Sequence, residues 1–229
     1  MRRRFDVLDG WRALAVALML VYHFLYDLAL FGVISWERLF STPLNVMQKF
    51  ICCSFILLAG ASARFSRDNL RRGIVVLAAG IAVELGALVG GQIIRFGILQ
   101  FMGVSMALYH FLGKYLQKLR PAVLTGASAV LFALTAWWTS AAAVSVGWLY
   151  PLGLMAPGFH SADYFPLLPW FFLFLAGYFA NRLWRDHRRI PAGGTRVPVL
   201  SALGRCSLPV YLLHQPVVYG LLWVFFRNT

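Results

Sequence analysis

Three ionisable residues share one stretch of apolar sequence, where charged groups are costly and usually mark function. They are Arg12, His23 and Asp27, with His23 eleven residues after Arg12 and Asp27 four residues after His23. On an α-helix the first spacing leaves two side chains about 20° apart in azimuth and roughly 16 Å apart along the axis. The second spacing brings two side chains into contact. One helix face is therefore expected to carry a cation, an imidazole and a carboxylate.

This face suits a ligand with an anionic head and a long, thin arm. Guanidinium groups match phosphate oxygens. An imidazole can take a proton from an attacking hydroxyl or amine, or can itself accept an acyl group. Asp27 would orient the His23 imidazole, as the carboxylate of a catalytic triad does. An acyl-coenzyme A fits this arrangement, with its phosphates at arginines such as Arg12 and its thioester at His23.

Two more ionisable residues lie inside apolar segments. Glu84 is near the middle of its segment, so we expect its side chain to be protonated or paired. His214 is followed by Gln215 and Pro216, and the proline is expected to kink the helix and free a carbonyl group. A buried His–Gln pair on such a helix either lines a cavity or is satisfied by a neighbouring helix. On the first interpretation we assign His214 to coenzyme binding.

Arg95 and Asp163 lie at the ends of apolar segments. Arg95 either extends to the membrane interface or pairs with Asp27 or Asp163, and we assign it to coenzyme binding as well. Asp163 precedes the segment at residues 167–183, where it either caps that helix or binds and activates an acceptor hydroxyl. On the second interpretation Asp163 joins the catalytic set.

The overall composition is that of a membrane protein. Of the 229 residues, 60% are apolar and only 13% are charged, and the mean hydropathy is +0.71. Soluble domains are about half apolar and a quarter charged. The net charge of +13 would suggest nucleic acid in a soluble protein, but here the basic residues lie between apolar segments. They indicate anionic lipid or membrane orientation instead, and we expect no nucleic-acid partner. The cysteines show no metal-ligand spacing, and we predict no metal site.

Runs of roughly 17–25 apolar residues are long enough to cross a bilayer. They predict seven transmembrane helices, at residues 12–33, 46–63, 74–90, 93–112, 122–139, 167–183 and 208–226. Residues 140–166 are interrupted by glycine and proline and form an eighth span, a re-entrant piece or a loop. We predict a loop that dips into the membrane interface. The expected fold is all-α, a single polytopic transmembrane domain over residues 1–229.

Basic residues gather in alternate connections between these segments. They precede the first segment and follow the second, fourth and sixth, whereas the other connections hold only Arg38, Lys49 and Arg95. Because cytoplasmic connections carry the excess of Lys and Arg, this bias predicts a cytoplasmic N-terminus and, with seven spans, an external C-terminus.

Five motifs carry a resemblance to known membrane acyltransferases. The first, VLDGWRALAVALMLVYH at residues 7–23, resembles the first helix of the acyltransferase 3 family in its Leu-Asp-Gly-x-Arg-Ala-x-Ala opening and in the His eleven residues after the Arg. The others resemble bacterial relatives of heparan-alpha-glucosaminide N-acetyltransferase. They are HFLYDL (23–28), RFGILQ (95–100), DYFPLLPW with the following FLAG (163–177), and GRCSLPVYLLHQP (204–216).

The resemblance implies transfer of an acyl group, typically acetyl, from cytoplasmic acyl-coenzyme A to a carbohydrate hydroxyl or amine across the membrane. It also implies an essential role for His23, with Arg12 beside it. A bacterial inner membrane is the implied location. The expected partners are membrane lipid, acyl-coenzyme A and a carbohydrate or glycolipid acceptor, and a homo-oligomer is left open.

Two other classes of function stay open at this point. A proton-coupled transporter of small solutes would use His23, Asp27 and Glu84 as a relay. A non-catalytic relative would keep the helix bundle and bind lipid or a partner. The absence of a visible internal repeat and the Arg12–His23 spacing favour the acyltransferase over the transporter.

Overall fold

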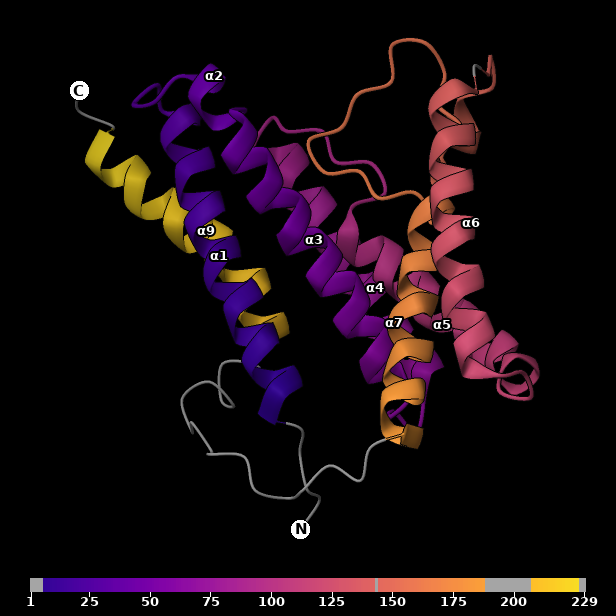
Figure 1. The fold of residues 1–229 in the computed structure, drawn as a ribbon. Helices are drawn as coiled ribbons and strands as arrows, with labels where there is room; N and C mark the ends of the chain where they lie inside the picture. The colour runs from indigo at the N-terminus through magenta and orange to yellow at the C-terminus, as the bar shows by residue number, and fades with distance from the viewer. Residues whose placement is uncertain (1–5, 143, 188–206, 227–229) are drawn as a thin grey trace. The chain divides into compact units, whose positions relative to one another are not determined.

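The computed structural model describes residues 6–142, 144–187 and 207–226, and these residues form helices, turns and loops without a strand (Figure 1). The α-helices are α1 (Asp6–Leu30), α2 (Trp36–Leu39), α3 (Thr42–Ala63), α4 (Asn69–Val89), α5 (Ile98–Leu116), α6 (Pro121–Ala141), α7 (Leu167–His187) and α9 (Ser207–Phe226). A short 3-10 helix, η1 (Gly147–Leu152), lies between α6 and α7. The all-α prediction is confirmed for this part of the chain.

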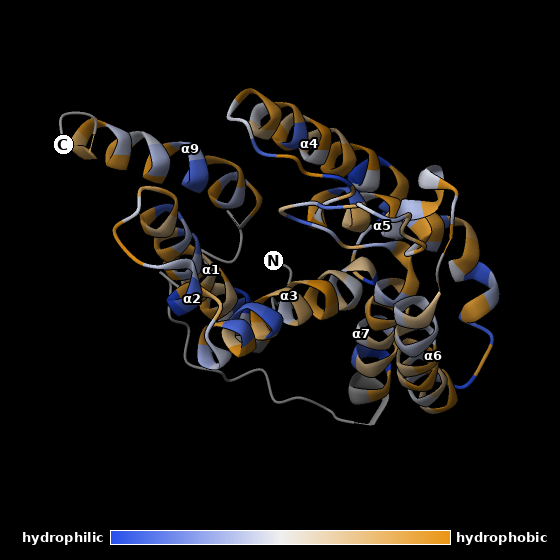
Figure 2. Cartoon of the chain, turned by 90° about the horizontal axis from the view of Figure 1, so that it is seen from above, coloured by the Kyte–Doolittle hydropathy of each residue, from blue (hydrophilic) through white to orange (hydrophobic). Residues whose placement is uncertain are grey.

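Each of the seven predicted apolar segments overlaps one long helix. By length and composition, α1, α3, α4, α6 and α9 are long and apolar enough to cross a membrane. Hydrophobic residues predominate along these helices in Figure 2. The protein is therefore a multi-pass membrane protein. Membrane crossing by α5 and by the shorter apolar helix Leu167–Leu183 within α7 stays a prediction.

The predicted start of the fourth segment, at residue 93, is wrong. Helix α5 begins five residues later, at Ile98, because Phe96 adopts a left-handed φ of 57° and Gly97 is extended. The carbonyls of Ile93 and Phe96 instead accept hydrogen bonds from Ala162 and Phe165, each at 2.9 Å. This stretch before α5 therefore pairs with the segment before α7.

The connection at residues 140–166 contains no long helix among its described residues. Helix α6 ends at Ala141, and the 3-10 helix η1 ends at Leu152, followed by Gly153, whose φ of 101° favours glycine. The predicted loop is thus confirmed in its secondary structure. Whether it dips into the membrane interface stays a prediction.

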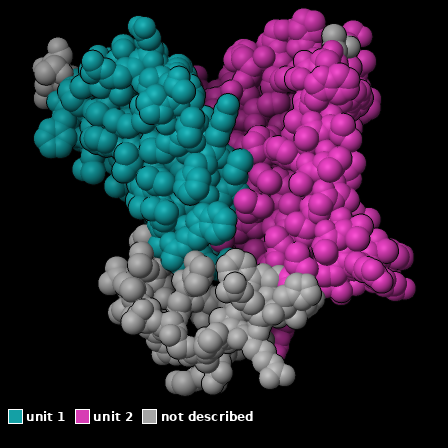
Figure 3. Space-filling model, in the orientation of Figure 1, with its two compact units in different colours: residues 1–55, 191–229 teal, residues 56–190 magenta. Residues whose placement is uncertain are grey.

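The chain divides into two compact units (Figure 3). Unit 1 contains residues 1–55 and 191–229, and unit 2 contains residues 56–190, so that α3 contributes to both. The prediction of one domain over residues 1–229 is not tested by this division. Each unit is described by itself below.

In unit 1, helix α1 packs against α9 and α2. One stripe of α1 supplies Val16, Met19 and Tyr22 to a buried apolar cluster that also includes Leu39 of α2 and Ile51 of α3. These side chains recur at helical spacing, as expected for a buried face. Their burial fixes the rotation of α1 and thereby the direction of its polar residues.

In unit 2, glycines allow two pairs of helices to approach closely. At the α4–α5 contact, a Cβ atom on Gly103 would lie only 2.6 Å from the backbone nitrogen of Leu77, and one on Gly73 only 2.7 Å from the Gly103 carbonyl oxygen. At the α3–α7 contact, Cβ atoms on Gly60 and Gly177 would overlap backbone atoms of the facing helix. Small residues serve this purpose in membrane helix pairs generally. The α4–α5 contact brings Glu84 of α4 to the start of α5.

Candidate active site

The predicted site residues divide between the two units. Unit 1 holds Arg12, His23, Asp27 and His214, and unit 2 holds Glu84, Arg95 and Asp163. Within each unit the structure brings residues together that are far apart in the sequence.

The two histidines of unit 1 are in direct contact. The ring centroids of His23 on α1 and His214 on α9 lie 4.6 Å apart, with an interplanar angle of 84°. His214 is buried and His23 is partly buried. Sequence analysis had assigned His214 to coenzyme binding, whereas its contact in the structure is with the predicted catalytic imidazole.

Backbone carbonyls fix the protonation pattern of both rings. His23 Nδ1 lies 2.9 Å from the Met19 carbonyl oxygen, and His214 Nδ1 lies 2.6 Å from that of Tyr211. Because a carbonyl oxygen only accepts hydrogen bonds, both Nδ1 atoms must carry the proton. Each neutral ring then has its basic lone pair on Nε2. In each of the two imidazoles, Nε2 is therefore the nitrogen that can accept a proton.

Asp27 has a different partner from the one predicted. Its side chain is fully buried, and its Oδ1 accepts a hydrogen bond of 2.7 Å from Gln215 Nε2. In a catalytic triad the carboxylate would hold Nδ1 of the base, but Nδ1 of His23 contacts the Met19 carbonyl. The backbone of α1 thus orients His23, and Asp27 connects α1 to α9.

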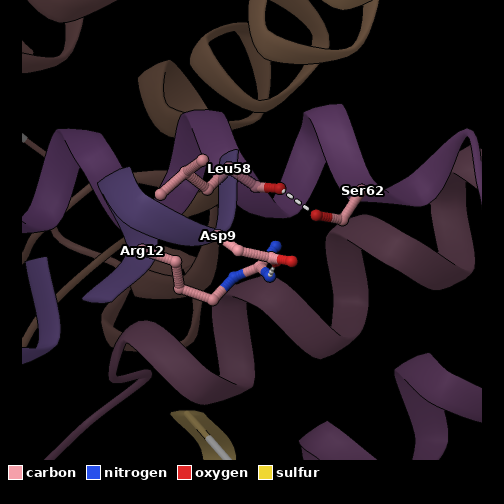
Figure 4. A network of polar contacts seen from close by, with 4 residues as sticks. All are labelled: Asp9, Arg12, Leu58 and Ser62. Atoms are coloured by element: carbon pink, nitrogen blue, oxygen red, sulfur yellow. Dashed lines mark hydrogen bonds and ion pairs between the residues drawn. The ribbon is translucent and has the colours of Figure 1, made fainter. Parts of the chain in front are cut away.

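Arg12 forms an ion pair one turn from its own position on α1. Its Nη1 lies 3.0 Å from Asp9 Oδ1, and the two side chains are 20% and 14% exposed (Figure 4). This partial exposure leaves the pair accessible to a ligand. The second contact drawn in Figure 4 belongs to α3 alone, where the Ser62 hydroxyl donates to the Leu58 carbonyl at 2.6 Å.

Asp163 caps a helix, but not the one predicted. Its Oδ2 accepts a 2.9 Å hydrogen bond from the backbone N–H of Ile98, at the start of α5 rather than of α7. A Cβ atom on Gly97 would lie 2.5 Å from this oxygen, so glycine leaves room for the carboxylate. A carboxylate in this place satisfies a free N–H and complements the helix dipole.

Burial raises the pKa of Asp163 from its usual 3.8 to about 6, although the hydrogen bond from Ile98 opposes the shift. Because the folded-state pKa is the higher one, the native protein binds more protons than the unfolded chain between these values. The resulting stabilisation is complete below about pH 4 and is lost as the pH rises through about 6.

We therefore expect the titration of Asp163 to make the melting temperature roughly 2–4 °C higher at pH 5 than at pH 7.5. Asp163→Asn keeps an oxygen for the Ile98 N–H but removes the titration, so its melting temperature should lose this dependence. Thermal unfolding in detergent at several pH values measures the melting temperatures of wild type and variant. An equal pH dependence in wild type and variant would contradict the assignment.

A cleft of about 260 Å³ lies in unit 2. Its lining residues are Glu84, Leu88, Gln92, Ile93, Ile94, Arg95 and Tyr150. Glu84 was expected to be protonated or paired, and it has a hydrogen-bond partner, because Gln100 Nε2 donates to its carboxyl group. Gln100 Oε1 in turn accepts a hydrogen bond of 2.6 Å from the backbone N–H of Gly97. Of the alternatives for Arg95, an ion pair with Asp163 is not found among the described residues, where Asp163 caps α5. Pairing of Arg95 with Asp27, which belongs to unit 1, is not tested.

No group of three His, Cys, Asp or Glu side chains that could hold a metal ion occurs in the described ranges. Cys206 lies outside these ranges.

One comparison with known proteins decides the family. The family model for the catalytic domain of heparan-alpha-glucosaminide N-acetyltransferase matches residues 4–216. The chain belongs to this family. The match runs through both units and includes every predicted site residue. No curated protein and no solved structure matches the chain. Membership in the heparan-alpha-glucosaminide N-acetyltransferase family makes the protein a membrane acetyltransferase.

Proposed function

We propose that the protein transfers an acyl group, typically acetyl, from cytoplasmic acyl-coenzyme A to a hydroxyl or amine of a carbohydrate-type acceptor. The observation that carries this proposal is the contact between His23 and His214 on two apolar helices, with both Nδ1 protons held by carbonyls. A neutral imidazole in this state is a general base. The family match supplies the acetyl-transfer chemistry.

In the proposed reaction, His23 Nε2 takes the proton from the acceptor as its oxygen or nitrogen attacks the thioester carbonyl. The new C–O or C–N bond forms, the C–S bond breaks, and the imidazolium returns the proton to the leaving thiolate. The products are the acylated acceptor and coenzyme A. In the alternative sequence, His23 Nε2 attacks the thioester carbonyl, the C–S bond breaks and coenzyme A leaves as the thiolate. The acceptor then attacks the acyl-imidazole, the C–N bond to His23 breaks, and the acceptor proton passes through the imidazole to the thiolate.

Arg12 would hold the phosphates of the coenzyme. Its guanidinium is partly exposed and is directed by Asp9, and planar guanidinium groups bind phosphate oxygens in pairs. The basic residues of alternate connections support a cytoplasmic position for this end of α1. A bacterial inner-membrane location rests on the resemblance to bacterial relatives. An acceptor-binding role for Asp163, which belongs to unit 2 and caps α5, stays a prediction.

We expect Arg12→Lys to raise KM for acetyl-coenzyme A about tenfold and to change kcat little, because lysine keeps the charge but loses paired hydrogen bonding. Initial rates over a range of coenzyme concentrations measure the two constants separately. Arg38→Lys, at an exposed position of α2, is the matched control and should leave both constants unchanged. A fall in kcat with unchanged KM would contradict a binding role.

Proteoliposomes with acetyl-coenzyme A on one side and an amino sugar on the other test the proposed function as a whole. The proposal predicts acetylated amino sugar in vesicles that contain the protein, together with thiol release on the coenzyme side. Flux of a solute without thioester cleavage would instead support the transporter. Coenzyme binding without release would support a non-catalytic relative.

A further inference from the structure

A buried carboxyl group and a buried amide face each other between α1 and α9. Gln215 Nε2 donates to Asp27 Oδ1 at 2.7 Å. The second oxygen of each group, Asp27 Oδ2 and Gln215 Oε1, is also buried, and neither has a hydrogen-bond partner among the described residues. With Asp27 ionised, both of these oxygens can only accept. An ionised pair therefore leaves two buried acceptors unsatisfied, which is costly.

One proton on Asp27 Oδ2 would satisfy both atoms. A protonated carboxyl group presents an O–H beside a C=O, and a primary amide presents an N–H beside a C=O. Two such planar groups can form two antiparallel hydrogen bonds. The observed Gln215 Nε2 to Asp27 Oδ1 contact would be one of them, and a bond from Asp27 Oδ2–H to Gln215 Oε1 would be the other.

Among the described residues, no cation forms an ion pair with Asp27. Helix α1 carries no Lys or Arg after Arg12, and α9 carries none at all. The titratable neighbours on the two helices are His23, Tyr26 and His214, and each imidazole directs its Nδ1–H to a backbone carbonyl. A fully buried carboxylate without a cation partner is strongly unfavourable.

We propose that Asp27 is protonated and forms with Gln215 a neutral, doubly hydrogen-bonded acid–amide pair that positions α9 on α1. Because Gln215 directly follows His214, the pair fixes the place where His214 contacts His23. Gln215 is thus a positioning residue. Its effect on turnover rests on the proposed function, whereas the pair itself does not.

Infrared spectroscopy of the full-length protein at pH 8 tests the protonation directly. We expect a C=O stretching band of a protonated carboxyl group that shifts on deuteration and disappears in Asp27→Asn. A wild-type spectrum without the band, or the same carboxyl bands in wild type and Asp27→Asn, would overturn the proposal. This readout needs no turnover. An inactive wild type that shows the band would therefore count against the proposed function alone.

Three variants test the positioning role. Asp27→Asn preserves both hydrogen bonds as an amide–amide pair, whereas Asp27→Ala leaves two buried groups of Gln215 unpaired. We expect Asp27→Ala to melt at least about 5 °C below Asp27→Asn and to turn over at least about tenfold more slowly. The exchanged pair, Asp27→Asn with Gln215→Glu, should behave like Asp27→Asn and regain the infrared band. Equal damage in Asp27→Asn and Asp27→Ala would show that the negative charge is required and would overturn the proposal.

Discussion

We expect purified protein with His23→Asn to transfer acetyl groups at least about 100-fold more slowly than wild type, because it has lost the proposed general base. The asparagine amide can still donate to the Met19 carbonyl that holds His23 Nδ1, so the helix keeps its local contact. His23→Ala removes both the base and this contact, and its turnover should be equally low. Initial rates of thiol release, normalised to folded protein, measure the loss.

His110→Gln is the matched control for the His23 variants. His110 is exposed on α5 and lies in unit 2, outside the histidine pair. Its rate should equal that of wild type. Full activity of His23→Asn, with the control also active, would exclude His23 as base and as acyl carrier.

The largest effect on stability is expected at the α3–α7 contact in unit 2. A Cβ atom on Gly177 would overlap the backbone of Leu57, so Gly177→Val forces the two helices apart. Overpacking a tight interface costs about 3 kcal/mol or more when backbone rather than a side chain blocks the new atoms. For a chain of this length the melting temperature should fall by about 6–12 °C.

Gly86→Ala on α4 is the control for this substitution. Nothing lies within 4 Å of the Cβ atom that it adds, and alanine favours a helix over glycine. Thermal unfolding of both variants in the same detergent separates interface packing from helix propensity. Equal melting temperatures would contradict the close helix contact.

Sequence patterns predicted the long helices because each apolar run is long enough to bury a complete helix in lipid. They could not predict where α5 begins. Residues 93–97 continue the apolar run that forms α5. However, Phe96 takes a left-handed conformation, and the stretch pairs with residues 162–165. Hydropathy contains no information on such pairing between distant segments.

The candidate site was predicted only where one helix sets the geometry. Helical spacing correctly places Arg12, His23 and Asp27 in the same long helix, but it suggested Asp27 as the partner of His23. The observed partners of Asp27 and Asp163 are Gln215 and Ile98, which come from other helices. A glutamine in an apolar segment indicated that Gln215 needs a polar partner. The structure was needed to identify Asp27 as that partner.

Thiol release from acetyl-coenzyme A by the unaltered protein, with an amino sugar as acceptor, tests the central claim most directly. We expect one coenzyme A to be released for each acetyl group found on the sugar. Neither product should form without the protein. Saturable binding of the coenzyme with neither product formed would contradict it, and so would solute flux without thioester cleavage.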